Sequence, residues 1–157
     1  MGTEIERKFL VNEDLWVPPD TYMRCTQGYL AVGPPVAVRV RMMGDIATLN
    51  IKRATLDIER MEFEYEIPVT DARELLAHAC LGHSIEKTRY VLEHERHKWE
   101  IDVFEGRNEG LIVAEIELRH RDETFAKPAW AGKEVSGDPR YLNTHLCLNP
   151  YTQWKDR

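Results

Sequence analysis

The sequence lacks the features that mark secreted and membrane-spanning proteins. Its three cysteines, Cys25, Cys80 and Cys147, lie far apart and form no C-x-x-C pair. This usage is typical of a protein kept in a reducing cytoplasm. No apolar run approaches the roughly 20 residues that a membrane-spanning helix needs, and the first residues contain no apolar signal-peptide core. We therefore expect a cytoplasmic protein with no membrane partner.

Two common kinds of binding site are also missing. The six histidines show no ligand spacing, so a zinc site is not expected. The sequence has no glycine-rich P-loop, so any recognition of phosphate must come from side chains. A net charge of −6 argues against a general nucleic-acid binder, and we expect no nucleic-acid partner. A basic site can nevertheless lie inside an acidic protein.

The length and composition are those of one ordinary globular domain. The chain has 157 residues, of which 43% are hydrophobic and 31% charged. That length is enough to bury a substantial core. Neither an internal repeat nor an interdomain linker interrupts it, so we expect a single domain over residues 1–157. Composition leaves a monomer and a homodimer equally open.

Short segments of the chain alternate strictly between charged and apolar residues. Residues 58–67 alternate most regularly, with Arg60, Glu62, Glu64 and Glu66 on one side and apolar residues on the other. Period-two alternation predicts β-strands with one charged and one apolar face. The same pattern predicts further strands over residues 4–11, 21–30, 36–42, 47–52, 86–92, 99–104 and 112–118.

Two helices are predicted between and after these strands. The first covers residues 70–81, where Asp71 and Glu74 fit a capping pair and Gly82 fits the C′ position. The second begins at Asp138-Pro139, an N-cap followed by proline at N1, and ends near Asn149. The segment between the last predicted strand and Gly132 is irregular.

The alternation allows two folds. One is an antiparallel sheet whose charged face is solvated by water. The other is a closed barrel whose charged faces line a channel, with the apolar faces outward under the helices and loops. Two observations favour the barrel. The charged positions contain almost no Ser, Thr, Gln or Asn, and the two signs of charge are segregated by strand.

The segregated charges indicate what such a channel would bind. Clustered guanidinium and ammonium groups suit a polyanion with several phosphates. Clustered carboxylates suit a hard divalent cation such as Mg²⁺ or Mn²⁺. The basic set is Arg39, Arg41, Lys52, Lys87 and Arg89, and the acidic set is Glu62, Glu64, Glu100, Asp102, Glu115 and Glu117. Together they predict a metal–polyphosphate site.

The N-terminal stretch Glu4-Ile5-Glu6-Arg7-Lys8 resembles the E-x-E-x-K signature of the CYTH, or triphosphate tunnel metalloenzyme, superfamily. Alone this pattern is weak, but the other motifs follow in order and cover nearly the whole chain. They are Arg39-x-Arg41, Lys52, Glu62-x-Glu64, Lys87-x-Arg89, Glu100-x-Asp102, Glu115-x-Glu117 and the Gly132-Lys133-Glu134-Val135 segment. The ordered series makes the resemblance specific.

The resemblance implies a mainly β fold, a closed eight-stranded antiparallel tunnel with a charged interior and a few flanking helices. It implies a small-molecule triphosphate substrate and a divalent metal, Mg²⁺ or Mn²⁺. The phosphates would be held by Lys8, Arg39, Arg41, Lys52, Lys87 and Arg89. The metal would be held by Glu4, Glu6, Glu117 and Glu115, with Asp102, Glu62 or Glu64 as further ligands.

The reaction that we expect from this resemblance is hydrolysis of inorganic tripolyphosphate to pyrophosphate and phosphate. Lys8 and Arg41 would act on the reacting phosphates, and Lys87 is a candidate general base because cationic neighbours lower a lysine pKa. The alternative, which the residues alone favour, is that Lys87 is one more phosphate ligand.

Other functions stay open at this stage. The family also includes thiamine triphosphatase, RNA 5′-triphosphatase and class IV adenylate cyclase activities, and a non-catalytic polyphosphate- or nucleotide-binding module is a further alternative. A short tunnel without appended domains favours the inorganic substrate. We expect Arg60 and Glu66 at a tunnel mouth, and Gln27 and Tyr29 are weaker candidates for the site.

Overall fold

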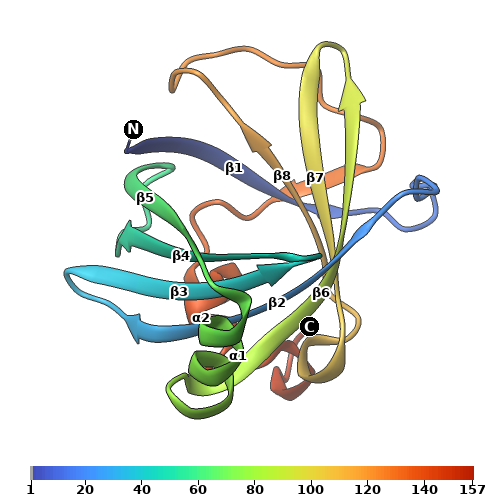
Figure 1. Cartoon of the computed structure of the whole chain (residues 1–157). Coiled ribbons are helices and arrows are strands. Elements are labelled where there is room, and N and C mark those ends of the chain that lie inside the picture. Colours follow the sequence, from blue (N-terminus) through green and yellow to red (C-terminus); the bar gives the residue numbers. More distant parts are fainter. Residues whose placement is uncertain (1) are drawn as a thin grey trace.

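The computed structural model describes residues 2–157, in which antiparallel strands wind into a barrel (Figure 1). The strands are β1 (Thr3–Val11), β2 (Met23–Val32), β3 (Val36–Met43), β4 (Ile46–Arg53), β5 (Glu59–Ile67), β6 (Leu81–His94), β7 (His97–Phe104), β8 (Ile112–Glu117) and β9 (Ala131–Glu134). The helices are α1 (Val69–His78) and α2 (Asn143–Leu146), with short 3₁₀ turns η1 (Gly106–Asn108), η2 (Pro139–Tyr141) and η3 (Tyr151–Gln153).

The barrel closes where β1 meets β5. The strands pair in the order β5-β4-β3-β2-β6-β7-β8-β1, and Glu4 of β1 lies opposite Arg60 of β5 at the closing seam. Closure confirms the eight-stranded antiparallel barrel that the charge pattern favoured over an open, solvated sheet. The additional strand β9 pairs with β1 next to the ring. It was not predicted, because four residues are too few to show alternation.

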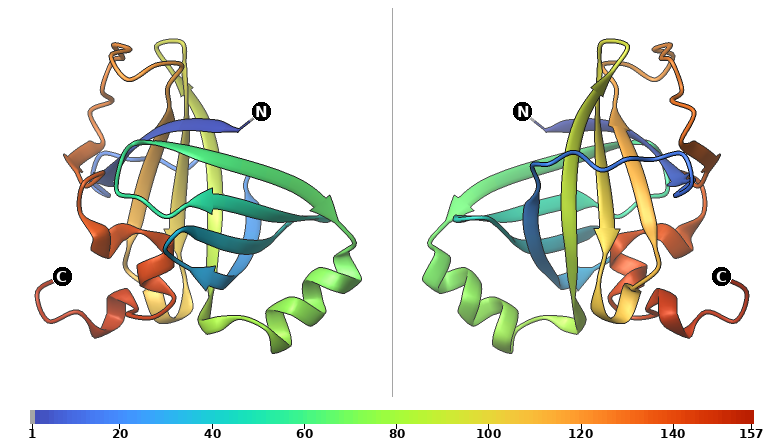
Figure 2. Two further views of the ribbon diagram at one scale, coloured as in Figure 1. Left: turned by 90° about the vertical axis from the view of Figure 1, so that its left-hand side faces the viewer. Right: turned by 90° about the vertical axis from the view of Figure 1, so that its right-hand side faces the viewer.

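The apolar faces of the strands point outward and form the hydrophobic cores. Phe9, Trp99 and Ile116 pack under Phe125 and Trp130 of the irregular segment. A second core packs the chain end against the outside of β6 and β7, and its members include Ile85, Phe104, Leu146 and Trp154. The helix α1 covers β3 and β4, and the C-terminal turns lie on the opposite side of the barrel from it (Figure 2).

The covering is incomplete along β5. The side chains Met61, Phe63 and Tyr65 share the outer face of this strand, and they are 45%, 37% and 56% exposed. The expectation that helices and loops cover every outer face therefore fails at this strand.

The first helix is shorter than predicted. It ends at His78, and Pro68 stands at its N-cap without a side-chain capping hydrogen bond, so the capping pair of Asp71 and Glu74 was wrong. The C′ assignment of Gly82 was also wrong, because Leu81 already pairs with Tyr29 and begins β6. Helical periodicity alone would continue the helix to residue 81. Leu81 instead pairs with β2, so the helix ends earlier.

The second predicted helix is interrupted. Asp138 accepts a hydrogen bond from the backbone N–H of Arg140, as an N-cap should, but only the 3₁₀ turn η2 follows. Leu142 then takes an extended conformation with ψ of 136°, and α2 contains only four residues. The interruption lets this part of the chain bend across the barrel.

Within residues 2–157, Cys25, Cys80 and Cys147 are free thiols. Within residues 2–157 no helix has the length and apolar composition that crossing a membrane requires.

The packing of Trp99 generates a stability prediction. Trp99 is fully buried, and its ring lies 5.6 Å from Phe9, 5.8 Å from Phe125 and 5.4 Å from Trp130 between centroids. We expect Trp99→Ala to lower the free energy of unfolding by about 3–5 kcal/mol in urea denaturation, because it leaves a cavity among these rings. The exposed Tyr65→Ala should change it by no more than about 0.5 kcal/mol. Equal effects of the two substitutions would contradict this core.

Candidate functional site

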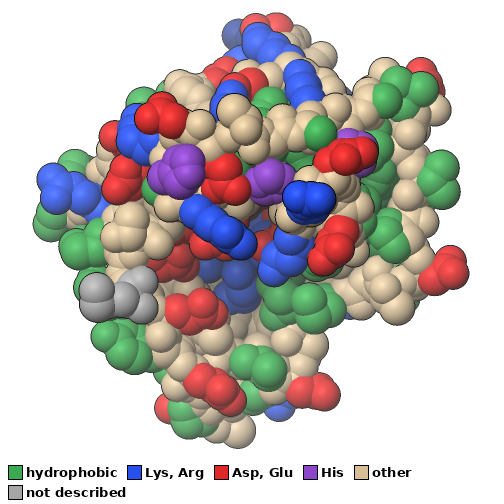
Figure 3. Space-filling model, turned by 90° about the horizontal axis from the view of Figure 1, so that it is seen from above, with side chains coloured by type: hydrophobic (Ala, Val, Ile, Leu, Met, Phe, Trp, Pro, Cys, Tyr) green, Lys and Arg blue, Asp and Glu red, His purple; other side chains and the backbone are tan. Residues whose placement is uncertain are grey.

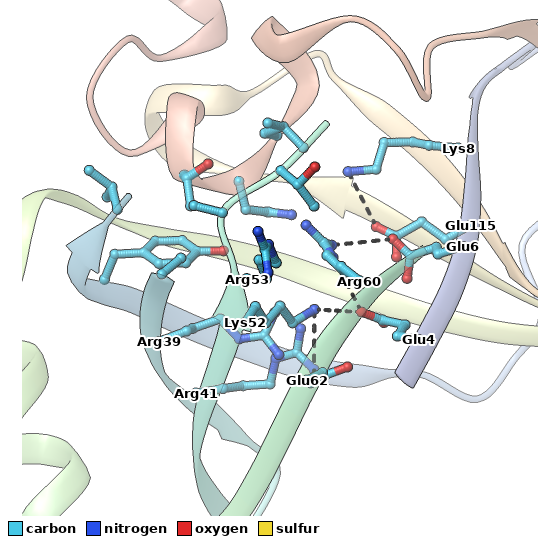
Figure 4. A pocket seen from close by; sticks show the side chains of 18 of the residues that line it. Glu4, Glu6, Lys8, Arg39, Arg41, Lys52, Arg53, Arg60, Glu62 and Glu115 are labelled. Carbon is cyan, nitrogen blue, oxygen red and sulfur yellow. Dashed lines mark hydrogen bonds and ion pairs between the residues drawn. The ribbon is translucent and has the colours of Figure 1, made fainter. Parts of the chain in front are cut away.

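The charged faces of the strands enclose a cavity of about 510 Å³ (Figure 4). A hollow with acidic and basic side chains around it is visible from above (Figure 3). Of the residues expected to bind phosphate or metal, all but Asp102 line the cavity. They are Glu4, Glu6, Lys8, Arg39, Arg41, Lys52, Glu62, Glu64, Lys87, Arg89, Glu115 and Glu117. The barrel thus brings together side chains from six strands in one place.

Strand register places opposite charges beside one another on neighbouring strands that line this cavity. Lys8 of β1 lies opposite Glu115 of β8, and Lys52 of β4 lies opposite Glu62 of β5. Because residues two apart share a face, one register turns Glu4, Glu6 and Lys8 of β1 inward together. The strands that contribute carboxylates, β7, β8, β1 and β5, follow one another around the barrel, whereas β2 separates the basic strands β3 and β4 from the basic strand β6.

Glu4 is held by two cations. Its Oε2 lies 3.2 Å from Lys52 Nζ and 3.5 Å from Arg60 Nε. Burial raises the pKa of Glu4, but the charges of Lys52 and Arg60 outweigh burial and lower the pKa to about 2. Glu4 is therefore a carboxylate throughout the neutral range.

Glu6 and Glu115 form a neighbouring acidic pair. Burial, together with the charges of Glu115 and Glu4, raises the pKa of Glu6 well above its usual range. Burial acts in the same direction on Glu115, but Lys8 and Arg89 outweigh it and hold the pKa of Glu115 well below its usual range. Two carboxylates in contact share a proton more easily than they bear two charges. The pair would thus gain most from a divalent cation.

Lys87, Arg89 and Asp102 form a buried ionic group on β6 and β7. Asp102 Oδ2 lies 2.7 Å from Lys87 Nζ, and the guanidinium of Arg89 donates two hydrogen bonds to Asp102 at 2.7 and 2.9 Å. Arg89 also lies 2.5 Å from Glu100. Burial opposes ionisation of Asp102, yet Lys87 and Arg89 lower its pKa to about 2.

The ammonium of Lys87 is fully buried, and burial lowers its pKa. The neighbouring Asp102 carboxylate raises this pKa, and the Arg89 charge lowers it further, with a net shift below the usual lysine value. A lysine with a lowered pKa can take part in proton transfer more easily than an exposed one.

Arg39 and Arg41 present donors to the cavity. Arg41 Nε donates to Gln27 Oε1 at 3.1 Å, which fixes the guanidinium of Arg41. Among the described residues, Arg39 Nε and Gln27 Nε2 are buried without a hydrogen-bond partner. Buried donors without partners are costly, so an anion with several oxygens would be stabilised here. Gln27 supports the site through Arg41, and Tyr29 lines the cavity.

Sequence reasoning misplaced one residue of the site. Arg60 does not lie at a mouth of the tunnel, because it lines the cavity between Glu4 and Glu6. Arg60 lies two residues before Glu62 on β5 and therefore on the same face of the strand. This spacing was the signal in the sequence that Arg60 points inward. Glu66 shares that face, but it is exposed and does not belong to the lining.

Two connecting segments also line the cavity, and no motif pointed to them. The turn after β4 contributes Ala54, Thr55 and Leu56, and the C-terminal part contributes Leu142, between η2 and α2, with Asn143 and Thr144 at the start of α2. Their position follows from how the chain bends after its last strands, and local sequence patterns carry little of that information.

The carboxylate oxygens along the cavity have the chemistry of a hard-cation site. Yet within residues 2–157 no three His, Cys, Asp or Glu side chains are grouped so that they could hold a metal ion. The carboxylates contact lysine and arginine side chains instead: Lys52 and Arg60 at Glu4, and Lys8 at Glu115.

Comparison with known proteins agrees with this geometry. The CYTH domain family matches residues 2–142. An inorganic triphosphatase of Acetivibrio thermocellus is 46% identical over 156 residues, which cover 99% of this chain and 100% of that protein. An inorganic triphosphatase of Nitrosomonas europaea is 36% identical over 94% of this chain and 98% of its own length. A crystal structure of the inorganic triphosphatase NE1496 superposes with a TM-score of 0.66, at 35% identity over 94% of this chain and 96% of that one.

The ionic group around Asp102 generates a second stability prediction. Asp102→Asn leaves Lys87 buried without its countercharge and Arg89 with Glu100 alone, and we expect the free energy of unfolding to fall by about 3–5 kcal/mol. Urea denaturation measures this loss. The exposed Asp122→Asn is the matched control and should stay within about 0.5 kcal/mol of the parent. A loss no larger than the control's would show that Asp102 does not neutralise the two cations.

Proposed function

Because this chain belongs to the CYTH domain family, we propose that it is an inorganic triphosphatase that depends on a divalent metal. It would hydrolyse tripolyphosphate to pyrophosphate and orthophosphate. The observation that carries the proposal is the cavity, where eight basic side chains and a set of carboxylates face one another inside a closed barrel. A metal-bound polyphosphate is the simplest ligand that would contact both the basic and the acidic side chains.

The basic side chains are proposed to hold the phosphates. The guanidinium groups of Arg39, Arg41 and Arg89 can each donate to two phosphate oxygens, whereas Lys8 and Lys52 act as point charges. The buried Arg39 Nε, which has no hydrogen-bond partner in residues 2–157, supports this role. Such groups bind the triphosphate, fix its orientation and balance the charge that develops on the leaving phosphate.

The carboxylates are proposed to hold Mg²⁺ or Mn²⁺. Glu4, Glu6, Glu115 and Glu117 lie on the adjacent strands β1 and β8, and Glu62 and Glu64 on β5 are further candidates. The metal would supply charge neutralisation at the phosphate oxygens. We propose Asp102 as the partner of Lys87 and Arg89 rather than as a metal ligand, because both its oxygens contact these two cations.

Lys87 is proposed to act as the general base and to contact phosphate when it is protonated. Burial and Arg89 lower its pKa, which supports proton transfer, while the ion pair with Asp102 orients Nζ. Lys8 and Arg41 would orient the reacting phosphates from opposite strands of the barrel.

The cellular location and the oligomeric state are proposals as well. The three free thiols support a reducing compartment, and we propose the cytoplasm. The cavity is lined by a single chain, so both a monomer and a homodimer are compatible with the proposed activity.

The reaction is tested by identifying products. With Mg²⁺ or Mn²⁺ and tripolyphosphate, we expect equal amounts of pyrophosphate and orthophosphate in ³¹P NMR, and far slower turnover of ATP and thiamine triphosphate. Cyclic AMP from ATP would identify a cyclase. Tight binding of tripolyphosphate without any product would identify a binding module.

Glu4→Ala tests the metal assignment within the same assay. We expect loss of about 100-fold or more in metal-dependent turnover, because a direct ligand should matter at least as much as an outer partner. Glu66→Ala is the matched control: it removes a carboxylate from the same barrel outside the cavity lining and should keep parental activity. Retained turnover in Glu4→Ala would overturn the metal site.

Lys87→Arg tests the general base. Arginine keeps the positive charge but cannot accept a proton near neutral pH, so kcat should fall by about 10²–10⁴-fold. For the parent we expect kcat to rise with pH through a pKa below the usual lysine value, since the neutral amine is the base. This rise should be absent in Lys87→Arg. If the variant keeps both the rise and most of kcat, Lys87 is a phosphate ligand only.

A further inference from the structure

The carboxylates that we propose as metal ligands are already paired with cations of the chain itself. Lys52 and Arg60 contact Glu4, at 3.2 and 3.5 Å, and Arg60 also approaches Glu6 at 4.0 Å (Figure 4). Lys8 lies 3.9 Å from Glu115. A metal ion could bind these oxygens only by displacing one cation with another.

Arg60 has the central place among these cations. It lies on β5 directly opposite Glu4, at the seam where the barrel closes, and its guanidinium extends from Glu4 to Glu6. Its side chain is only 18% exposed, so solvent screens these contacts weakly. A single guanidinium thus contacts both carboxylates of the E-x-E motif, and Lys52 supplies a second positive charge at Glu4.

The contacts of Arg60 differ from those of the buried Arg89. Arg89 makes two hydrogen bonds with Asp102 and a 2.5 Å contact with Glu100. The contacts of Arg60 are long, at 3.5 and 4.0 Å, and they provide charge with little directed hydrogen bonding. Long contacts of this kind are exchangeable, because a phosphate oxygen can replace the carboxylate with better geometry.

We propose that Arg60 is an internal counter-cation that blocks the metal site until triphosphate arrives. Triphosphate would draw the guanidinium of Arg60 from Glu4 and Glu6 to its own oxygens, and the two carboxylates would then be free to hold a divalent cation. This inference rests on the proposed function. It adds that metal and triphosphate bind with positive coupling, and that Arg60 supplies part of this coupling.

The coupling has a chemical purpose. Without Arg60 the two carboxylates would attract any free divalent cation and would repel a polyanion. With it, the empty cavity stays close to neutral at the E-x-E motif, and either ligand assists the other. By linkage, the factor by which triphosphate strengthens metal binding equals the factor by which metal strengthens triphosphate binding.

Arg60→Gln separates this role from a structural one, because its two effects have opposite signs. In calorimetric titrations of Mn²⁺ alone, we expect binding about fivefold or more tighter than in the parent. In titrations of tripolyphosphate alone, without metal and hence without turnover, we expect binding about fivefold or more weaker. A merely distorted cavity would weaken both.

Arg53→Gln is the matched control. Arg53 is exposed and also lines the cavity, so it removes the same charge without removing a contact to Glu4 or Glu6. Its Mn²⁺ affinity should stay within about twofold of the parent, which a long-range charge effect allows. If both arginine variants tighten Mn²⁺ binding equally, general charge and not the place of Arg60 is responsible, and the inference fails.

A second variant covers the case in which Arg60→Gln does not fold. In Arg60→Lys one ammonium can contact only one of the two carboxylates, so Mn²⁺ alone should bind about twofold or more tighter than in the parent. Unchanged or weaker Mn²⁺ binding in the folded variant would overturn the inference.

The outcomes also distinguish this inference from the proposed function. If the parent binds no Mn²⁺ with or without tripolyphosphate and forms no products, the metal site itself is wrong. If the parent hydrolyses tripolyphosphate with Mn²⁺ but Arg60→Gln leaves Mn²⁺ affinity unchanged, only the role of Arg60 is wrong.

Discussion

The fold depends on one constraint: many charges are enclosed in a small cavity, and each needs a countercharge nearby. A buried unpaired charge costs several kcal/mol or changes its protonation state. The barrel meets this constraint by placing a cation beside a carboxylate on neighbouring strands, such as Lys52 beside Glu62 and Lys8 beside Glu115. The closing seam between β1 and β5 is the place where Glu4 meets Arg60. The strand pairing that closes the sheet therefore also brings a cation beside the E-x-E motif.

The alternation of charged and apolar residues was enough to predict the barrel and its inward charges. Once β5 alternates from Arg60 to Glu66, its register decides which face is inside, and closure follows from the need to enclose the charges. Local patterns could not predict the end of α1, because pairing of Leu81 with β2 decides it. They also missed β9 and the bend at Leu142, which depend on packing of the chain end against the finished barrel.

The same limit applies to the site. The alternation of inward and outward positions placed twelve of the expected residues on the cavity wall. It could not distinguish side chains that line the cavity from inward ones buried behind the lining, such as Asp102. The alternation along β5 already pointed Arg60 inward, but it could not say how deep in the barrel the side chain lies. Depth along a strand depends on how strands stagger around the barrel, and alternation contains no information on stagger.

Two kinds of ion pair result from this arrangement, and their geometry distinguishes them. Asp102 is fully buried and makes short hydrogen bonds with Arg89, so replacing these contacts would leave charges without partners. Glu4 and Glu6 instead have contacts of 3.2 to 4.0 Å with Lys52 and Arg60, beside an open cavity. Contacts of that length keep the empty barrel neutral, yet a phosphate or a metal can replace them without leaving any charge unpaired. In the proposed function, the short pairs therefore maintain the wall, and the long pairs are the ones that the ligands would exchange.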